Sequence, residues 1–130
     1  MSNNFLSVPI SIGELCDKYT ILKIKMIKIT NKDKLDKIKR EYDYLTPLIE
    51  QYKICDTHLD KLKDINSMLW NIEDSIRIKE SNNEFDDEFI QIARSVYITN
   101  DRRFEIKNII NSYYNSDVCE VKSYASYTSD

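Results

Sequence analysis

The sequence predicts an all-α protein, an antiparallel bundle of three to four helices. Apolar residues recur at steps of three and four along most of the chain, residues typical of helix starts precede each such stretch, and only one glycine and two prolines interrupt the 130 residues. With 42% apolar and 32% charged residues, the composition suits one domain. We expect an N-terminal arm at residues 1–10, a helical domain at 11–114 and a flexible C-terminal tail at 115–130.

The first helix is predicted to begin at a capping box. In this motif the Ser11 oxygen accepts a hydrogen bond from the Glu14 amide, and the Glu14 carboxylate reaches back to the Ser11 amide. Gly13 lies inside the box, where the missing side chain lets another helix or a ligand approach the first turn. The apolar positions that follow step by four and three and form one stripe: Leu15, Tyr19, Leu22, Met26 and Ile29.

The second helix is predicted to start after a turn at residues 31–33, with Asp33 as its N-cap. It repeats the spacing of the first helix with Leu35, Ile38, Tyr42, Leu45, Ile49 and Tyr52. Pro47 interrupts this pattern. Because proline disfavours the helical conformation of Thr46 and removes one backbone hydrogen bond, we expect a kink or a break with a new start near residue 46.

Two further helices follow the same rules. Asp56 or Thr57 is expected to cap the third helix, and the fourth is expected to start near Phe85 or Asp86. The third helix has the apolar stripe Leu62, Ile65, Leu69, Ile72 and Ile76. The fourth has the stripe Phe89, Ile92, Val96, Thr99, Arg103, Ile106, Ile110 and Tyr113, in which two polar residues interrupt the apolar ones.

Connections of a few residues between the helices favour antiparallel neighbours. The heptad-like stepping of the first three helices also fits a contact between two chains. We therefore expect a homodimer with an intermolecular helical interface.

The composition excludes several classes of function. Phosphate-binding loops need several glycines, and this chain has one. A net charge of −3 argues against a nucleic-acid binder, and the basic stretch at residues 18–40 is interpreted as a solvated helix face. Cys16, Cys55 and Cys119 show no metal-ligand spacing, which indicates free thiols in a reducing compartment, and the single histidine, His58, is expected in solvent. A cytoplasmic protein without a membrane span is expected.

Polar and aromatic side chains gather in three of the predicted helices where a simple bundle does not require them. They are Glu14, Asp17 and Lys18 in the first, Trp70, Glu73, Asp74 and Arg77 in the third, and Arg94, Tyr97, Asn100, Asp101 and Arg102 in the fourth. Many lie three or four residues apart and therefore share a helix face. If these faces converge, acids of the first and third helices meet arginines of the fourth.

Three interpretations of this convergence stay open. The first is a network of interhelical salt bridges that fixes how the helices pack. The second is a pocket for a small anionic ligand, in which Arg94, Arg102 and Arg103 bind a phosphate or carboxylate group.

A third interpretation is metal-dependent hydrolysis of nucleotides. All-helical nucleotide pyrophosphohydrolases bind Mg²⁺ with pairs of carboxylates on neighbouring helices, and Glu14 and Asp17 resemble their first pair. Glu73 and Asp74 would supply the second pair. Because these two residues are adjacent, their side chains point about 100° apart, unlike the family's pairs.

The three polar stretches also carry a resemblance. Residues 11–25, 66–77 and 89–102 resemble a family of small proteins of unknown function from bacteria, phages and large DNA viruses, over roughly residues 8–111. The resemblance implies that the candidate residues belong to the family pattern, whereas Pro47 and the chain after residue 114 lie outside it. Together with an AT-rich type of composition, it suggests a viral, virion-associated binding or structural module and not an enzyme.

Overall fold

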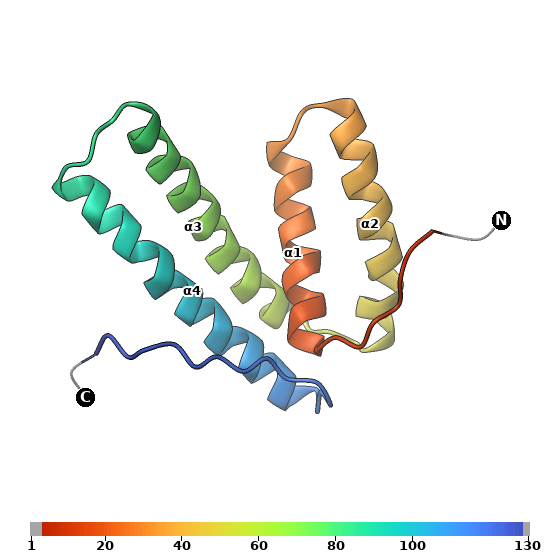
Figure 1. Ribbon diagram of the computed structural model, residues 1–130. Helices are drawn as coiled ribbons and strands as arrows, with labels where there is room; N and C mark the ends of the chain where they lie inside the picture. The colour runs from red at the N-terminus through yellow and green to blue at the C-terminus, as the bar shows by residue number, and fades with distance from the viewer. Residues whose placement is uncertain (1–3, 129–130) are drawn as a thin grey trace.

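The computed structural model describes residues 4–128 and confirms an all-α antiparallel bundle (Figure 1). Its helices are α1 (Ile12–Lys28), α2 (Lys32–Gln51), α3 (Asp56–Ser81) and α4 (Asp87–Tyr113). The predicted arm and tail both run past the described part of the chain, at residues 1–3 and 129–130. None of the described helices is long and apolar enough to cross a membrane.

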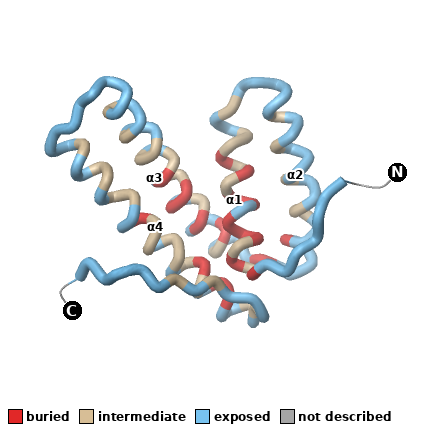
Figure 2. The backbone as a smooth tube through the Cα atoms, viewed as in Figure 1, coloured by how far each residue is buried: buried red, intermediate tan, exposed pale blue. Residues whose placement is uncertain are grey.

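The helices form two hairpins that diverge like the arms of a V (Figure 1). α1 contacts all three other helices, whereas α2 contacts α1 alone among the described helices. We name the side with the α2–α3 connection, residues 52–55, the closed end. The side with the α1–α2 and α3–α4 turns, residues 29–31 and 82–86, is the open end. Figure 2 shows that the buried residues gather toward the closed end, where α1 meets α3 and α4.

The core at the closed end confirms most of the predicted apolar stripes of α1 and α3. Its buried apolar residues include Leu15, Cys16, Tyr19, Leu62, Ile65 and Ile110. The predicted stripes of α2 and α4 are wrong at their last residues, because Tyr52 and Tyr113 are exposed. Both lie at the end of a helix, beyond the point where the neighbouring helices cover it.

Two of the predicted helix starts are confirmed in detail. The Glu14 amide donates to the Ser11 oxygen at 3.0 Å, and the Phe89 amide donates to Asp86 at 2.9 Å. The second half of the capping box is wrong, because the Glu14 carboxylate binds a lysine on α4 instead of the Ser11 amide. A charged partner offers this carboxylate a stronger bond than a backbone amide does.

The other two helices begin one or two residues earlier than predicted. Asn31, not Asp33, caps α2 and accepts from the Lys34 amide at 3.0 Å. Cys55, not Asp56 or Thr57, is the N-cap of α3. Cys55 makes no side-chain hydrogen bond as a cap, so no capping side chain marks the start of α3.

Pro47 does not break α2, which continues to Gln51. Of the two expected outcomes, the break with a new start near residue 46 is therefore wrong, and the kink stays a prediction. Proline removes the hydrogen bond of one amide, which is a small loss for a helix of 20 residues. The Thr46 hydroxyl donates to the Tyr42 carbonyl at 2.9 Å, and Ile49 is buried in the core just after the proline.

The tail after α4 has no regular structure and lies along α4 as an extended strap (Figure 1). The Tyr127 hydroxyl donates to Asp101 at 2.7 Å, and its ring lies 5.0 Å from that of Tyr97. The predicted flexibility of this tail stays a prediction, as does the homodimer.

Candidate functional site

The first turn of α1 approaches α4 through Gly13. The Gly13 amide donates to Asn111 Oδ1 at 2.6 Å. A Cβ atom at this position would lie 2.7 Å from the Lys107 carbonyl oxygen, closer than real Cβ atoms come to other atoms. Glycine is therefore needed here for contact between two backbones.

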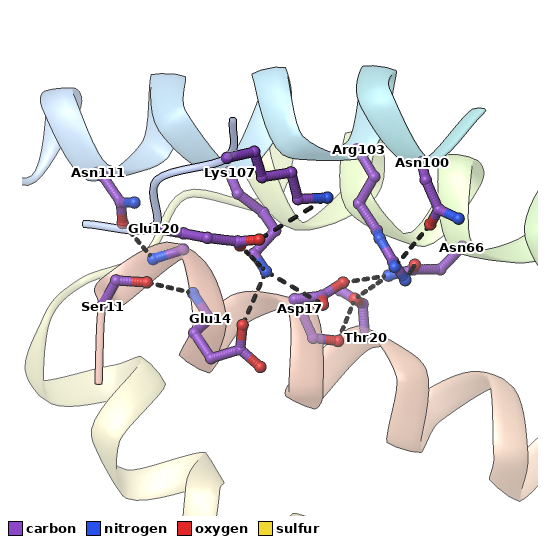
Figure 3. Close-up of polar contacts among 12 residues, drawn as sticks. Ser11, Glu14, Asp17, Thr20, Asn66, Asn100, Arg103, Lys107, Asn111 and Glu120 are labelled. Atoms are coloured by element: carbon purple, nitrogen blue, oxygen red, sulfur yellow. Dashed lines mark hydrogen bonds and ion pairs between the residues drawn. The ribbon is translucent and has the colours of Figure 1, made fainter. Parts of the chain in front are cut away.

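Lys107, one helical turn before Asn111 in α4, is enclosed by carboxylates (Figure 3). Its side chain is 8% exposed. The ammonium nitrogen lies 2.7 Å from Glu14 and 3.7 Å from Asp17, both of α1, and 2.8 Å from Glu120 of the tail. We call Lys107, Glu14, Asp17 and Glu120 the Lys107 cluster. It ties α1, α4 and the tail together at the closed end.

The ionisation of the Lys107 cluster follows from these contacts. Burial lowers the pKa of Lys107, but its hydrogen bonds to Glu120 and Glu14 outweigh burial, so the pKa is raised overall. The bond from Lys107 holds the pKa of Glu120 below its usual 4.5. Lys107 and Glu120 are therefore both charged at neutral pH. The cluster fits the interpretation of an interhelical salt-bridge network that fixes packing.

A second polar chain continues from Asp17 toward the open end. The Asn66 amide nitrogen of α3 donates to Asp17 at 2.8 Å and to the Thr20 hydroxyl at 3.1 Å. Arg103 of α4 donates to the amide oxygens of Asn66, at 3.1 Å, and Asn100, at 2.8 Å. The Arg103 guanidinium is thus fixed by two neutral amides, and it has no ion pair within the described part of the chain.

A cavity of about 380 Å³ lies between the two arms. It is lined by Ile21, Ile24, Asn66, Leu69, Trp70, Glu73, Asp74, Arg77 and Arg103. Arg103 and Asn66 lie at its inner end, because α3 runs from the closed end at Asp56 toward the open end. At the outer end Arg77 donates to Glu73 at 3.0 Å. The volume is within the range of small-molecule sites.

The structure divides the predicted site into separate places. Trp70, Glu73, Asp74 and Arg77 line the cavity as a group. Glu14 and Asp17 belong to the Lys107 cluster, and Asn100 holds Arg103. Tyr97 and Asp101 contact the tail. Lys18 is exposed and lines a second pocket beside Glu14 and Asp17. Arg94 and Arg102 are exposed and line none of these places.

The expectation that acids of the first and third helices meet the arginines of the fourth is therefore corrected. The acids of α1 meet a lysine, Lys107, and the only arginine of α4 that lines the cavity within the described residues is Arg103. Arg94 and Arg102 point elsewhere because successive residues of a helix are rotated by about 100°, and only one ridge of α4 faces α1 and α3.

The four carboxylates of the metal interpretation are not gathered. Glu14 and Asp17 lie against the ammonium of Lys107, while Glu73 and Asp74 line the cavity. Across residues 4–128, no group of three or more His, Cys, Asp or Glu side chains is arranged to hold a metal ion.

Sequence reasoning missed Asn66, Lys107, Asn111 and Glu120. A signal for the two α4 residues, Lys107 and Asn111, was present, because Thr99, Arg103, Lys107 and Asn111 follow one another at steps of four. Such a row forms one ridge of a helix, and all but Arg103 are buried. Asn66 and Glu120 had no comparable signal.

His58 is also placed differently from the prediction. It is half-buried, its Nδ1 lies 2.9 Å from the Tyr114 hydroxyl, and its ring packs edge-on against Tyr113 and Tyr114. The histidine connects the start of α3 to the end of α4 and does not sit free in solvent. The three cysteines are free, as predicted.

The Lys107–Glu120 bond predicts how docking of the tail depends on pH. Because folding lowers the pKa of Glu120, its stabilisation is complete above about 4.5 and is lost as the pH falls through the lower folded value. At pH 7 the Glu120→Gln variant is expected to be less stable by about 1 kcal/mol, discounted for the partial exposure of Glu120. Urea unfolding of both proteins from pH 7 to pH 3 measures the difference, which should vanish in acid. A difference independent of pH would contradict the assignment.

The comparisons with known proteins agree with the resemblance and extend it along the chain. Among curated proteins and solved structures, none matches this sequence. A family of unknown function, DUF6165, matches residues 6–130. The match includes Pro47 and the tail, which the motifs alone had left outside the family pattern. Since it covers nearly the whole sequence, the chain belongs to this family of unknown function.

Proposed function

We propose that this protein is a binding module for a small molecule with an apolar body and one carboxylate or phosphate group. The cavity between α1 and α3 is the proposed site. The observation that carries the proposal is the position of Arg103, an arginine without an acidic partner at the inner end of a largely apolar cavity.

Arg103 has the properties of an anion-binding group. A guanidinium has five N–H donors, and the contacts to Asn66 and Asn100 use two of them. Both partners are neutral, so the positive charge is not cancelled by a direct contact. The two amides fix the plane of the group, which reduces the entropy lost when it binds a planar carboxylate or a phosphate.

The rest of the cavity supports an apolar ligand body. Ile21 and Ile24 of α1 face Leu69 and Trp70 of α3 across it. Trp70 is half-buried and therefore still has surface to contribute. At the outer end Arg77 is already paired with Glu73, so Arg103 is the free cation of the cavity among the described residues.

Trp70 allows a direct test, because it is the only tryptophan in the sequence. The probe is 1-anilinonaphthalene-8-sulfonate, which combines an aromatic body with one anionic group. We expect it to quench Trp70 fluorescence by energy transfer at stoichiometric occupancy. Arg103→Gln should weaken this binding about tenfold or more, since a hydrogen bond to a charged group contributes roughly 1.5–3 kcal/mol.

Arg102→Gln is the matched control. It removes the same charge from the preceding residue of α4, which is exposed and does not line the cavity. Circular dichroism and thermal melting establish that both variants are folded. Equal loss of binding in both variants, or no quenching of Trp70 in the wild type, would overturn the proposal.

A further inference from the structure

Charge is strongly segregated between the two arms of the molecule. Residues 23–40, around the α1–α2 turn, contain eight Lys or Arg and two Asp, a net charge of +6. Residues 73–88, around the α3–α4 turn, contain seven Asp or Glu and two Lys or Arg, a net charge of −5. We call these segments the basic tip and the acidic tip. Both lie at the open end, on separate arms (Figure 1).

Several of these charges have no ion-pair partner among the described residues. Within the acidic tip, Lys79 binds Glu84 at 3.1 Å and Asp86 at 3.0 Å and holds the turn together. Glu80 and Asp87 of the acidic tip, and Lys28 and Lys32 of the basic tip, are exposed and take part in no ion pair inside residues 4–128. Each tip thus presents free charge of one sign.

Each tip also exposes apolar side chains. Ile27 on the basic tip is 69% exposed. On and beside the acidic tip, Ile78 is 60%, Phe85 58% and Ile90 51% exposed. A single exposed apolar residue is ordinary, but several beside a field of charge fit the composition of an interface with an apolar centre and a polar rim.

We propose that two copies of this chain associate through their tips, the basic tip of each copy on the acidic tip of the other. A two-fold axis perpendicular to the view of Figure 1 exchanges the two arms and turns the open ends toward each other. That operation places +6 opposite −5 twice in one closed dimer. The cavities of both copies then face the space enclosed by the four arms.

A second copy fits these surfaces better than a nucleic acid does. Phosphates would be attracted to the basic tip but repelled by the acidic tip on the facing arm, and the chain as a whole carries −3. A second copy uses both tips and neutralises both. The acidic tip shares Glu73, Asp74 and Arg77 with the lining of the cavity. The four charges that the test changes do not line it: Lys28, Lys32, Glu80 and Asp87.

Charge reversal tests the proposal. In 50 mM salt, sedimentation velocity should show a wild-type dimer, and 1 M salt should weaken it, since the Debye length is then about 3 Å. The variant Lys28→Glu/Lys32→Glu lowers the net charge of the basic tip from +6 to +2, and Glu80→Lys/Asp87→Lys raises that of the acidic tip from −5 to −1. Each alone should associate about tenfold or more weakly than the wild type. An equimolar mixture should recover the dimer as a heterodimer.

The matched control is Lys53→Glu/Lys61→Glu, which makes the same change of charge with two exposed lysines near the closed end. It should dimerise like the wild type, and circular dichroism establishes that every variant is folded. A monomeric wild type in 50 mM salt, wild-type species that grow beyond a dimer with concentration, or a mixture that fails to form the heterodimer would overturn the proposal. Any of these results leaves the binding of the probe near Trp70 unaffected.

Discussion

Lys107→Met is expected to lower the free energy of unfolding by about 3 kcal/mol, the cost typical of removing one partner from a buried ion pair. Methionine preserves most of the volume of the side chain, so the loss reports mainly on charge. Without the ammonium, the carboxylates of Glu14 and Asp17 lose their ion-pair partner, and Glu120 keeps only the longer contact with Lys122, at 3.8 Å. Urea unfolding followed by circular dichroism measures the change.

Two further variants separate charge from packing. Lys61→Met is the control, because Lys61 is exposed on α3, and its effect should stay within about 0.5 kcal/mol. Adding Asp17→Asn to Lys107→Met removes one of the unpaired carboxylates, so the double variant should be more stable than Lys107→Met alone. If Asp17→Asn instead destabilises the protein equally with and without Lys107, the two residues are not coupled.

Gly13→Ala is expected to destabilise the protein by about 2 kcal/mol, although alanine is the better helix former by about 1 kcal/mol. The added methyl group would lie 2.7 Å from the Lys107 carbonyl oxygen and 2.9 Å from Asn111 Oδ1. Because the nearest atom belongs to the backbone, α1 must move away from α4 as a whole. Such a shift also stretches the bond between the Gly13 amide and Asn111. Thermal and urea unfolding measure the loss.

Asn111→Ala shows which of the two close contacts matters. Combined with Gly13→Ala, it removes the side-chain contact at 2.9 Å and leaves the backbone contact at 2.7 Å. We therefore expect Gly13→Ala to destabilise the Asn111→Ala protein about as much as it destabilises the wild type. Lys18→Ala, an exposed change on the same helix, is the control. If Gly13→Ala raised stability as propensity alone predicts, α1 would not be held against α4 at this point.

These two sites also determine the shape of the cavity. Gly13 and the Lys107 cluster hold α1 on α4 at the closed end, and the chain Asp17–Asn66–Arg103 continues from there to the inner end of the cavity. The same ion network therefore packs the bundle and positions the arginine to which we assign ligand binding. A variant such as Asp17→Asn that loosens this chain should affect the orientation of Arg103 as well as stability.

The positions of the helices along the chain, and the starts of two of them, follow from local signals in the sequence. Ser11 and Asp86 are caps because their side chains bond amides three residues away, a contact that needs no other part of the chain. The apolar stripes of α1 and α3 are buried because their spacing matches the helical repeat. The break expected at Pro47 does not occur, since proline removes one hydrogen bond only and Ile49, just after it, is buried in the core.

The candidate site is formed by contacts between residues far apart in the chain, so local sequence patterns predicted only part of it. The sequence indicated that Trp70, Glu73, Asp74 and Arg77 share a region, because they lie on one helix, and they do line one cavity. It could not choose Arg103 over Arg94 and Arg102, because that choice requires the rotation of α4 about its own axis relative to α1 and α3. Glu120 reaches Lys107 from an irregular tail that has no period to read.

By itself, then, the sequence determined an all-α bundle, its helices and the stretches that carry polar side chains, because caps and periodicity act within a few residues. The tertiary structure decided which polar groups are paired and which remain free. Lys107 is enclosed by three carboxylates, whereas Arg103 is held by two amides. That difference follows from which ridge of α4 faces α1, and the approach of the two backbones at Gly13 fixes it.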